Sequence, residues 1–243
     1  MQKAHIGGNL TRSGRRVAFL AILLLCLTGS LGVWGNEQAL AGPASRDIRK
    51  AQQKKDIIVA VGDSLTAGLR VEAQMAYPAQ LERKLRARGY DCTVVNAGVS
   101  GETSSGTLSR IQWVVSRLKP DIVILETGAN DGLRGIDPQV LEDNLDQLVK
   151  FLRGKGIVVV LAGMQMLPNL GPEYTAAFAR VYSETARRYS LIFMPFFLES
   201  VAGDPRLNQA DGIHPTGAGY TRIVDNLLPY IVRAIRKQSE TSP

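Results

Sequence analysis

The sequence predicts an α/β domain in which a parallel sheet is covered by helices on both faces, a three-layer α/β/α sandwich. Two observations predict this fold. Apolar runs of strand length alternate with amphipathic stretches of helix length along most of the chain. One of the runs, DIVILE at 121–126, is apolar almost throughout, as a strand covered on both faces should be. Right-handed crossovers between five such strands, each followed by a helix, give the layered arrangement.

The expected elements follow one another in regular order. The first strand spans residues 57–62. A helix then runs from Pro78, a residue favoured in a first helical turn, to Gly89, a residue favoured just past a helix end. The remaining strands are expected at 92–95, 121–126, 157–161 and 191–193, and the remaining helices at 107–118, 138–153, 172–189 and 217–233.

The first 41 residues have the layout of a secretory signal. Basic residues precede an apolar run from Val17 to Val33, and Ala39 and Ala41 form the A-x-A pattern that signal peptidase recognises. We expect cleavage after Ala41, a periplasmic or secreted mature protein, and no stable membrane insertion after cleavage. A retained anchor is the alternative, although the run is short for a spanning helix. Residues 42–55 are expected to form a flexible leader, 56–236 the domain and 237–243 a C-terminal tail.

Composition indicates one globular domain. The chain has 243 residues, of which 45% are hydrophobic and 21% charged. Its net charge of +7 is partly due to the signal, because residues 1–41 hold four of the 29 basic and one of the 22 acidic residues, and +4 remains without them. No basic run with interleaved aromatic residues remains, so a nucleic-acid partner is not expected. Cys92 is the only cysteine after the signal and is expected to be buried in a monomer.

Three polar motifs follow expected strands, and a fourth lies in the loop before the last expected helix. In an open parallel sheet, the loops after the carboxyl ends of the strands converge on one crevice, where ligands bind. The motifs are Gly-Asp-Ser-Leu at 62–65, Asn-Ala-Gly at 96–98, Gly-Ala-Asn-Asp at 128–131 and Asp-Gly-Ile-His at 211–214. We therefore expect the functional site at this edge.

Ser64, Asp211 and His214 are the candidate catalytic residues of a serine esterase. Ser64 stands at a strand-to-helix turn, where its hydroxyl would project into the crevice. Histidine exchanges a proton near neutral pH, and His214 is the only histidine outside the signal, so it is the candidate base. Asp211 lies three residues earlier and is placed to fix the imidazole tautomer. Each motif taken alone has a simpler explanation. Asp63 and Ser64 could cap the helix that follows, and Asp211 could belong to a plain surface turn.

Hydrogen-bond donors for a tetrahedral intermediate are also present. Ser64 and Gly98 offer backbone N–H groups, and Asn130 offers a side-chain amide, so these three residues are the expected oxyanion hole. Gly98 leaves room for close approach of a substrate. Asn-Asp-Gly at 130–132 is also a common turn sequence, which is the alternative.

Taken together, these motifs resemble the SGNH hydrolase family. The likeness extends through 130–135, 164–168, 195–197 and 211–215, spans about 55–235, and is nearest to the periplasmic arylesterase, acyl-thioesterase and lysophospholipase enzymes of Gram-negative bacteria. It implies the SGNH hydrolase fold with a flavodoxin-like sheet order 2-1-3-4-5. It also implies hydrolysis of small acyl or aryl esters, thioesters or lysophospholipids through an acyl-enzyme, with no metal or organic cofactor.

Substrate contacts are expected from one acidic residue beside the serine and from apolar residues that follow the third and fourth strands, where an acyl chain would lie. Ordinary loop packing is the alternative for the apolar residues. The candidates are Asp63, Leu133, Ile136, Met164, Met166 and Leu167.

Three other functions are compatible with parts of this pattern. A carbohydrate O-acetyl esterase would use the same fold and triad. A metallophosphoesterase would gather Asp63, Asn130, Asp131, Asp211 and His214 around metal ions, although one histidine is few for a dinuclear centre. A non-catalytic binder of lipid or glycan would require the triad to be a coincidence.

Overall fold

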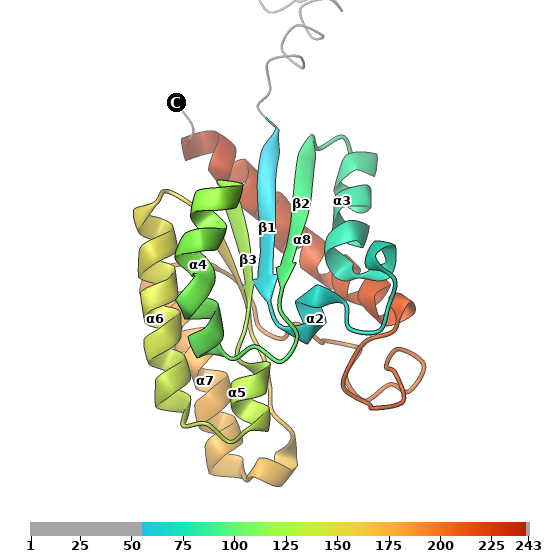
Figure 1. The fold of residues 1–243 in the computed structure, drawn as a ribbon, viewed down its shortest axis with the longest axis vertical. Helices are drawn as coiled ribbons and strands as arrows, with labels where there is room; N and C mark the ends of the chain where they lie inside the picture. The colour runs from blue at the N-terminus through green and yellow to red at the C-terminus, as the bar shows by residue number, and fades with distance from the viewer. Residues whose placement is uncertain (1–54, 242–243) are drawn as a thin grey trace, which may run out of the picture. The chain divides into compact units, whose positions relative to one another are not determined.

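The computed structural model describes residues 55–241. Within this range the sheet has five strands, all neighbours parallel, in the order β2-β1-β3-β4-β5, so the predicted sheet is confirmed (Figure 1). The strands are β1 (Asp56–Gly62), β2 (Cys92–Gly98), β3 (Ile122–Glu126), β4 (Val158–Ala162) and β5 (Ile192–Met194).

Helices cover both faces of this sheet. Helices α3 (Tyr77–Ala87) and α8 (Gly217–Thr241) pack on one face, and α4 (Ser104–Leu118), α6 (Pro138–Gly154) and α7 (Pro172–Tyr189) cover the other (Figure 1). The three-layer prediction is therefore confirmed. The shorter segments are α2 (Ser64–Ala67), η2 (Ala73–Met75), α5 (Ala129–Leu133) and η3 (Pro168–Leu170).

The core lies between the sheet and the two helix layers. All five residues of β3 are fully buried, as the apolar run predicted. The thiol of Cys92 is also buried, and this burial raises its pKa to about 11. No helix in the described range is long and apolar enough to cross a bilayer.

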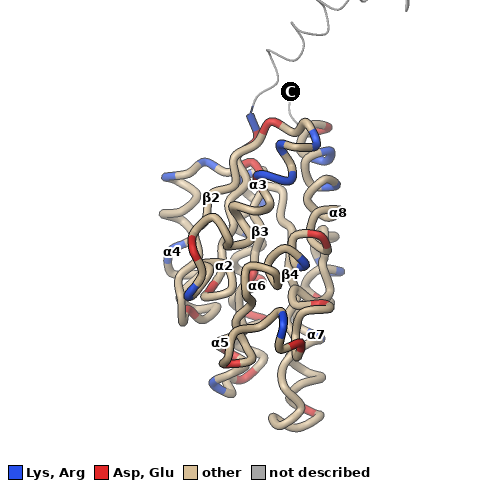
Figure 2. Tube along the Cα trace, turned by 90° about the vertical axis from the view of Figure 1, so that its right-hand side faces the viewer, with Lys and Arg blue, Asp and Glu red and all other residues tan. Residues whose placement is uncertain are grey.

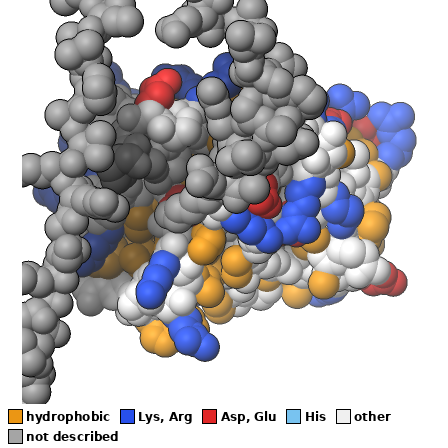
Figure 3. Space-filling model, turned by 90° about the horizontal axis from the view of Figure 1, so that it is seen from above, with side chains coloured by type: hydrophobic (Ala, Val, Ile, Leu, Met, Phe, Trp, Pro, Cys, Tyr) orange, Lys and Arg blue, Asp and Glu red, His pale blue; other side chains and the backbone are white. Residues whose placement is uncertain are grey.

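Basic residues gather at one end of the sheet. Basic residues occupy the last turns of α3, α4 and α7, where they complement the negative ends of the helix dipoles. Figure 2 shows Lys and Arg gathered at the end where β1 begins, and Figure 3 views the domain from that end. The candidate site lies at the opposite end, at the carboxyl ends of the strands.

Several element boundaries differ from expectation. Helix α8 was expected to end at Arg233 and to be followed by a tail. That expected end is wrong, because α8 continues to Thr241. Ala234 and Ile235 are buried, so the apolar stripe of α8 persists past the expected end. Strand β2 extends to Gly98, α4 begins at Ser104, and α5 replaces the turn considered at 130–132. The expected signal at 1–41 and all of the leader except Lys55 lie outside the described residues.

Candidate active site

Ser64 is held at a tight junction between β1 and α2. Strand β1 ends at Gly62, and Ser64 is the first residue of α2. The carboxylate of Asp63 caps this helix, because its Oδ1 accepts the N–H of Leu65 at 2.9 Å. The capping considered as an alternative is therefore present, and it presents Ser64 at the carboxyl edge of the sheet.

Ser64, His214 and Asp211 form a continuous chain of contacts. Ser64 Oγ lies 2.9 Å from His214 Nε2, and His214 Nδ1 lies 2.9 Å from Asp211 Oδ2. The other oxygen of Asp211 accepts the backbone N–H groups of Ile213 and His214, both at 3.0 Å. These backbone bonds, led by that of His214, hold the pKa of Asp211 well below its usual range. An ionised Asp211 favours the tautomer with the proton on Nδ1, which leaves Nε2 free to accept the serine proton.

Arg70 contacts Asp211 as well, and the sequence did not indicate this contact. Its Nη1 donates to Asp211 Oδ2 at 3.0 Å, so that oxygen is shared between Arg70 and His214. Arg70 stands in the loop after α2 with a left-handed backbone (φ 60). Nothing in its spacing from the motifs signals this contact, since the two residues are 141 positions apart.

Asn130 is brought to the same edge by α5. Its Nδ2 donates to Asp63 Oδ2 at 3.2 Å and to the backbone oxygen of Glu102 at 3.0 Å. Burial raises the pKa of Asp63 to about 6, while the hydrogen bonds from Leu65 and Asn130 oppose that rise. Both N–H groups of Asn130 therefore have protein acceptors, and the longer bond is the one to Asp63.

Gly98 lies where expected, but its N–H group is engaged. That N–H donates to Asn96 Oδ1 at 2.9 Å, and a Cβ on Gly98 would lie 2.3 Å from the backbone nitrogen of Ala67. Gly98 thus allows β2 and α2 to pack closely. Gly101, in the next loop, has a left-handed φ of +80, and its N–H has no acceptor among the described residues.

An apolar groove opens beside Ser64. Its volume is about 400 Å³, and it runs between the loops that follow β3, β4 and β5 and the loop before His214. Four of the predicted apolar contacts line it: Leu133, Met164, Met166 and Leu167. Ile136 and Asp63 do not line it; Asp63 pairs with Leu65 and Asn130, and the backbone oxygen of Ile136 accepts the Tyr174 hydroxyl.

Part of the groove wall was not predicted from the sequence. The residues that form this part come from the start of α2, the start of α5, the loop after β5 and the histidine motif itself. The rule that loops at the carboxyl ends converge could have found those after β5. They include Leu65, Ala129, Phe196, Leu198 and Ile213.

The side chains considered for a dinuclear metal centre are engaged with other protein groups. Asp131 is buried on α5 and accepts the N–H and hydroxyl of Ser104 at 2.8 and 2.5 Å. Asp211 is occupied by His214 and Arg70. Across residues 55–241 there is no group of three His, Cys, Asp or Glu residues arranged to hold a metal ion.

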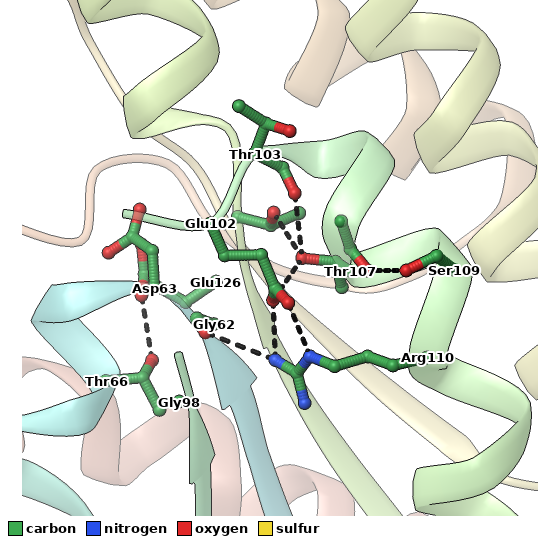
Figure 4. A network of polar contacts seen from close by, with 12 residues as sticks. Gly62, Asp63, Thr66, Gly98, Glu102, Thr103, Thr107, Ser109, Arg110 and Glu126 are labelled. Atoms are coloured by element: carbon green, nitrogen blue, oxygen red, sulfur yellow. Dashed lines mark hydrogen bonds and ion pairs between the residues drawn. The ribbon is translucent and has the colours of Figure 1, made fainter. Parts of the chain in front are cut away.

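A second buried carboxyl group, Glu126, lies behind the serine turn. Figure 4 shows it at the end of β3 beside Asp63 and Thr66. Thr66 Oγ1 donates to Glu126 Oε2 at 2.8 Å, and burial raises the pKa of Glu126 well above its usual range. In the sequence, Glu126 is marked only as the last residue of an expected strand.

Comparison with known proteins identifies relatives of this chain by sequence and by fold. The sequence profile of the GDSL-like lipase/acylhydrolase family matches residues 60–222. The chain is 40% identical over 190 residues to Esterase TesA of Pseudomonas aeruginosa, covering 78% of this chain and 94% of that protein. It is 36% identical over 170 residues to Thioesterase 1/protease 1/lysophospholipase L1 of Escherichia coli K12, covering 70% and 80%. The crystal structure of TesA matches with a TM-score of 0.71 and 41% identity, covering 74% of this chain and 99% of that one.

Proposed function

The chain belongs to the GDSL-like lipase/acylhydrolase family and is a carboxylic ester hydrolase, and on that premise we propose that Ser64 is its nucleophile, His214 its general base and Asp211 the carboxylate that orients the histidine. The observation that carries the proposal is the 2.9 Å contact between Ser64 Oγ and His214 Nε2. Its continuation from His214 Nδ1 to Asp211 Oδ2, also 2.9 Å, supports the role of Asp211.

The reaction follows from these contacts. Ser64 Oγ attacks the carbonyl carbon of the ester while its proton moves to His214 Nε2, giving a tetrahedral oxyanion. The oxyanion collapses, the bond to the leaving oxygen or sulfur breaks, and the leaving group takes the proton from Nε2. Water then attacks the carbonyl carbon of the acyl-Ser64 ester while His214 Nε2 accepts its proton. Collapse of this second tetrahedral oxyanion breaks the bond to Ser64 Oγ, which takes the proton back from Nε2, and the acid is released. Asp211 stays ionised and stabilises the imidazolium in both halves.

The proposed oxyanion donors are Ser64 N–H, Asn130 Nδ2 and Gly101 N–H. The first N–H of a helix has no acceptor within the helix, which favours Ser64. The Asn130 N–H that points to Asp63 makes the longer of its two bonds, so we assign it to the substrate oxygen. Gly101 replaces Gly98 in this proposal because the Gly98 N–H is already bonded to Asn96, whereas that of Gly101 is free.

The acyl part of the substrate would lie in the apolar groove beside Ser64. A groove of about 400 Å³ lined by methionine, leucine and phenylalanine side chains is suited to a flexible aliphatic or aryl group. The names of the relatives, an esterase and a thioesterase/lysophospholipase, support acyl oxygen esters and thioesters as the substrate class.

An acyl-length series tests this function. The purified protein is given p-nitrophenyl acetate through decanoate and the matching thioesters, with EDTA present. We expect turnover that rises as the acyl chain lengthens to fill the groove, resistance to EDTA, and loss of activity when an organophosphonate labels the peptide containing Ser64. Ser64→Ala should abolish turnover and labelling without unfolding the protein. No turnover by the folded wild type would favour the non-catalytic binder, and labelling elsewhere would refute the role of Ser64.

We also propose that the enzyme acts outside the cytoplasm, from the basic and apolar pattern of residues 1–41. Mass spectrometry of the mature protein tests this, with residue 42 as the expected first residue. An N-terminus at Met1 in cytosolic protein would contradict it.

A further inference from the structure

Glu102 and Arg110 form a closely bonded ion pair next to the proposed oxyanion donors. Arg110 Nε lies 2.6 Å from Glu102 Oε1, and Arg110 Nη2 lies 2.6 Å from Glu102 Oε2, so two donors of the guanidinium meet both carboxylate oxygens. Thr107 Oγ1 adds a third hydrogen bond to the carboxylate at 3.0 Å. The side chains are only 8% and 20% exposed. This pair is unlike the exposed ion pairs of the domain, since it is largely withdrawn from water and each carboxylate oxygen has a donor.

The pair connects three segments of the candidate site. Arg110 comes from α4, and its Nη2 also lies 3.4 Å from the backbone oxygen of Gly62, two residues before Ser64 (Figure 4). The backbone oxygen of Glu102 accepts one N–H of Asn130 at 3.0 Å. Arg110 is therefore linked to the serine turn on one side and, through Glu102, to the Asn130 amide on the other.

The segment after Glu102 is tied to α5 by two hydrogen bonds from Ser104 to Asp131, whereas the backbone oxygen of Glu102 itself is the atom that contacts the Asn130 amide. The N–H of Glu102 donates to the backbone oxygen of Val99 at 3.1 Å, and Arg134 Nη2 donates to the backbone oxygen of Gly101 at 2.8 Å. The direction of the Asn130 amide depends on where the Glu102 oxygen lies, because that oxygen holds one of its two N–H groups. If this oxygen moves, the other N–H turns away from the substrate.

We propose that Arg110 is a positioning residue: through its two bonds to Glu102 it fixes the backbone oxygen that aims the Asn130 amide at the oxyanion. This inference rests on the proposed function, in which Asn130 is an oxyanion donor. The guanidinium suits the role because its planar fork meets both carboxylate oxygens and still reaches Gly62. A lysine ammonium is a point donor on a flexible stem and would fix the carboxylate less well.

A double-mutant cycle in kcat tests the proposal. Arg110→Met should lower kcat roughly 10- to 100-fold with little change in KM, because a displacement of about 1 Å in a catalytic donor costs rates of that order. Arg110→Lys should recover part of the loss. In an Asn130→Ala background, Arg110→Met should have almost no further effect on kcat, since the residue through which it acts is gone.

Arg188→Met is the matched control. Arg188 pairs with Glu142 and Asp146 on the outer surface of α6 and α7, where its side chain is 46% exposed. Its removal should leave kcat and KM at the wild-type values. If Arg110→Met does not fold, Arg110→Lys and Glu102→Gln replace it in the cycle, and both should lower kcat in the wild-type background only.

The outcomes separate this inference from the proposed function. A slow Asn130→Ala beside a wild-type rate for Arg110→Met would overturn the inference alone. So would an equal loss from Arg110→Met in both backgrounds, because Arg110 would then act by another route. A wild-type rate for Asn130→Ala would refute the oxyanion role of Asn130, and the inference with it.

Discussion

Thr66 Oγ1 donates a hydrogen bond to Glu126 Oε2 across 2.8 Å, and this bond ties the helix that begins with Ser64 to the end of β3. Glu126 is fully buried, and its Oε1 has no hydrogen-bond partner among the described residues. Burial raises its pKa well above the usual range, with the neighbouring charge of Asp63 adding to the rise. Burial therefore favours the protonated form of Glu126 in the folded protein.

The first prediction concerns the pH dependence of stability. In wild type the unfolded chain ionises Glu126 near its ordinary pKa of 4.5, whereas burial holds the pKa of this group well above that value in the folded protein, so Glu126 lowers the free energy of unfolding as pH rises above 4.5. Glu126→Gln keeps the shape and the acceptor for Thr66 but cannot ionise. The variant should gain stability relative to wild type between pH 4 and pH 7.5. Urea unfolding across that range measures the difference, and a constant difference would show that Glu126 is ionised in the folded state.

The second prediction concerns Asn130. Asn130→Ala should lower kcat about 10²- to 10³-fold with a modest change in KM, because one proposed oxyanion donor is lost. Steady-state kinetics with p-nitrophenyl esters measures both constants. Asn226→Ala is the control. Asn226, on α8, also donates its side-chain amide to a backbone oxygen, that of Glu199, and this contact is exposed.

The third prediction separates the two glycines. Gly98→Ala should lower the free energy of unfolding by about 1 to 3 kcal/mol, because the new Cβ would lie 2.3 Å from the Ala67 nitrogen. Gly101→Ala meets no such obstacle but strains a left-handed backbone, so it should cost about 1 to 2 kcal/mol and lower kcat by displacing the proposed donor. Thermal unfolding and kcat are measured on both. A normal kcat in Gly101→Ala would remove Gly101 from the oxyanion hole.

The fourth prediction concerns Cys92. Its thiol is buried and has a pKa of about 11, so little thiolate is present at pH 8 and access is blocked. Iodoacetamide should leave Cys92 unmodified in the native protein for hours. After unfolding in urea, it should add one carbamidomethyl group at Cys92. Mass spectrometry distinguishes the two, and rapid labelling of the native protein would contradict the buried position.

Most of the fold was predictable because its strands are strongly marked. The run at 121–126 is apolar on both faces, and β3 is buried on both. By contrast α5 has five residues, and its Asn-Asp-Gly sequence is equally suited to a turn, so periodicity had too few positions to identify it. The end of α8 was missed because the residues after Ile235 are polar or charged and none of those described is buried, so no apolar stripe marks the last turns of the helix.

The candidate site was predictable for residues within the four motifs and for four apolar residues that follow the third and fourth strands and line the groove. Ser64, Asp211 and His214 stand at ends of strands or just before a helix, where topology alone brings side chains together. Arg70 and Arg110 were missed because their partners are fixed by loop paths rather than by a periodic pattern. Gly98 was assigned a donor role that a neighbouring side chain, Asn96, already occupies, and no sequence rule reveals which of two nearby glycines keeps a free N–H.

The contact between Ser64 and His214 joins positions 150 residues apart. His214 comes just before α8, which packs against α3, β4 and β5. A nascent chain emerging from the ribosome would therefore complete the turn that holds Ser64, the proposed nucleophile, early, but would lack the imidazole of His214 until almost all of the domain had been synthesised. Under the proposed mechanism, the Ser64 hydroxyl would have no general base until the segment before α8 is in place.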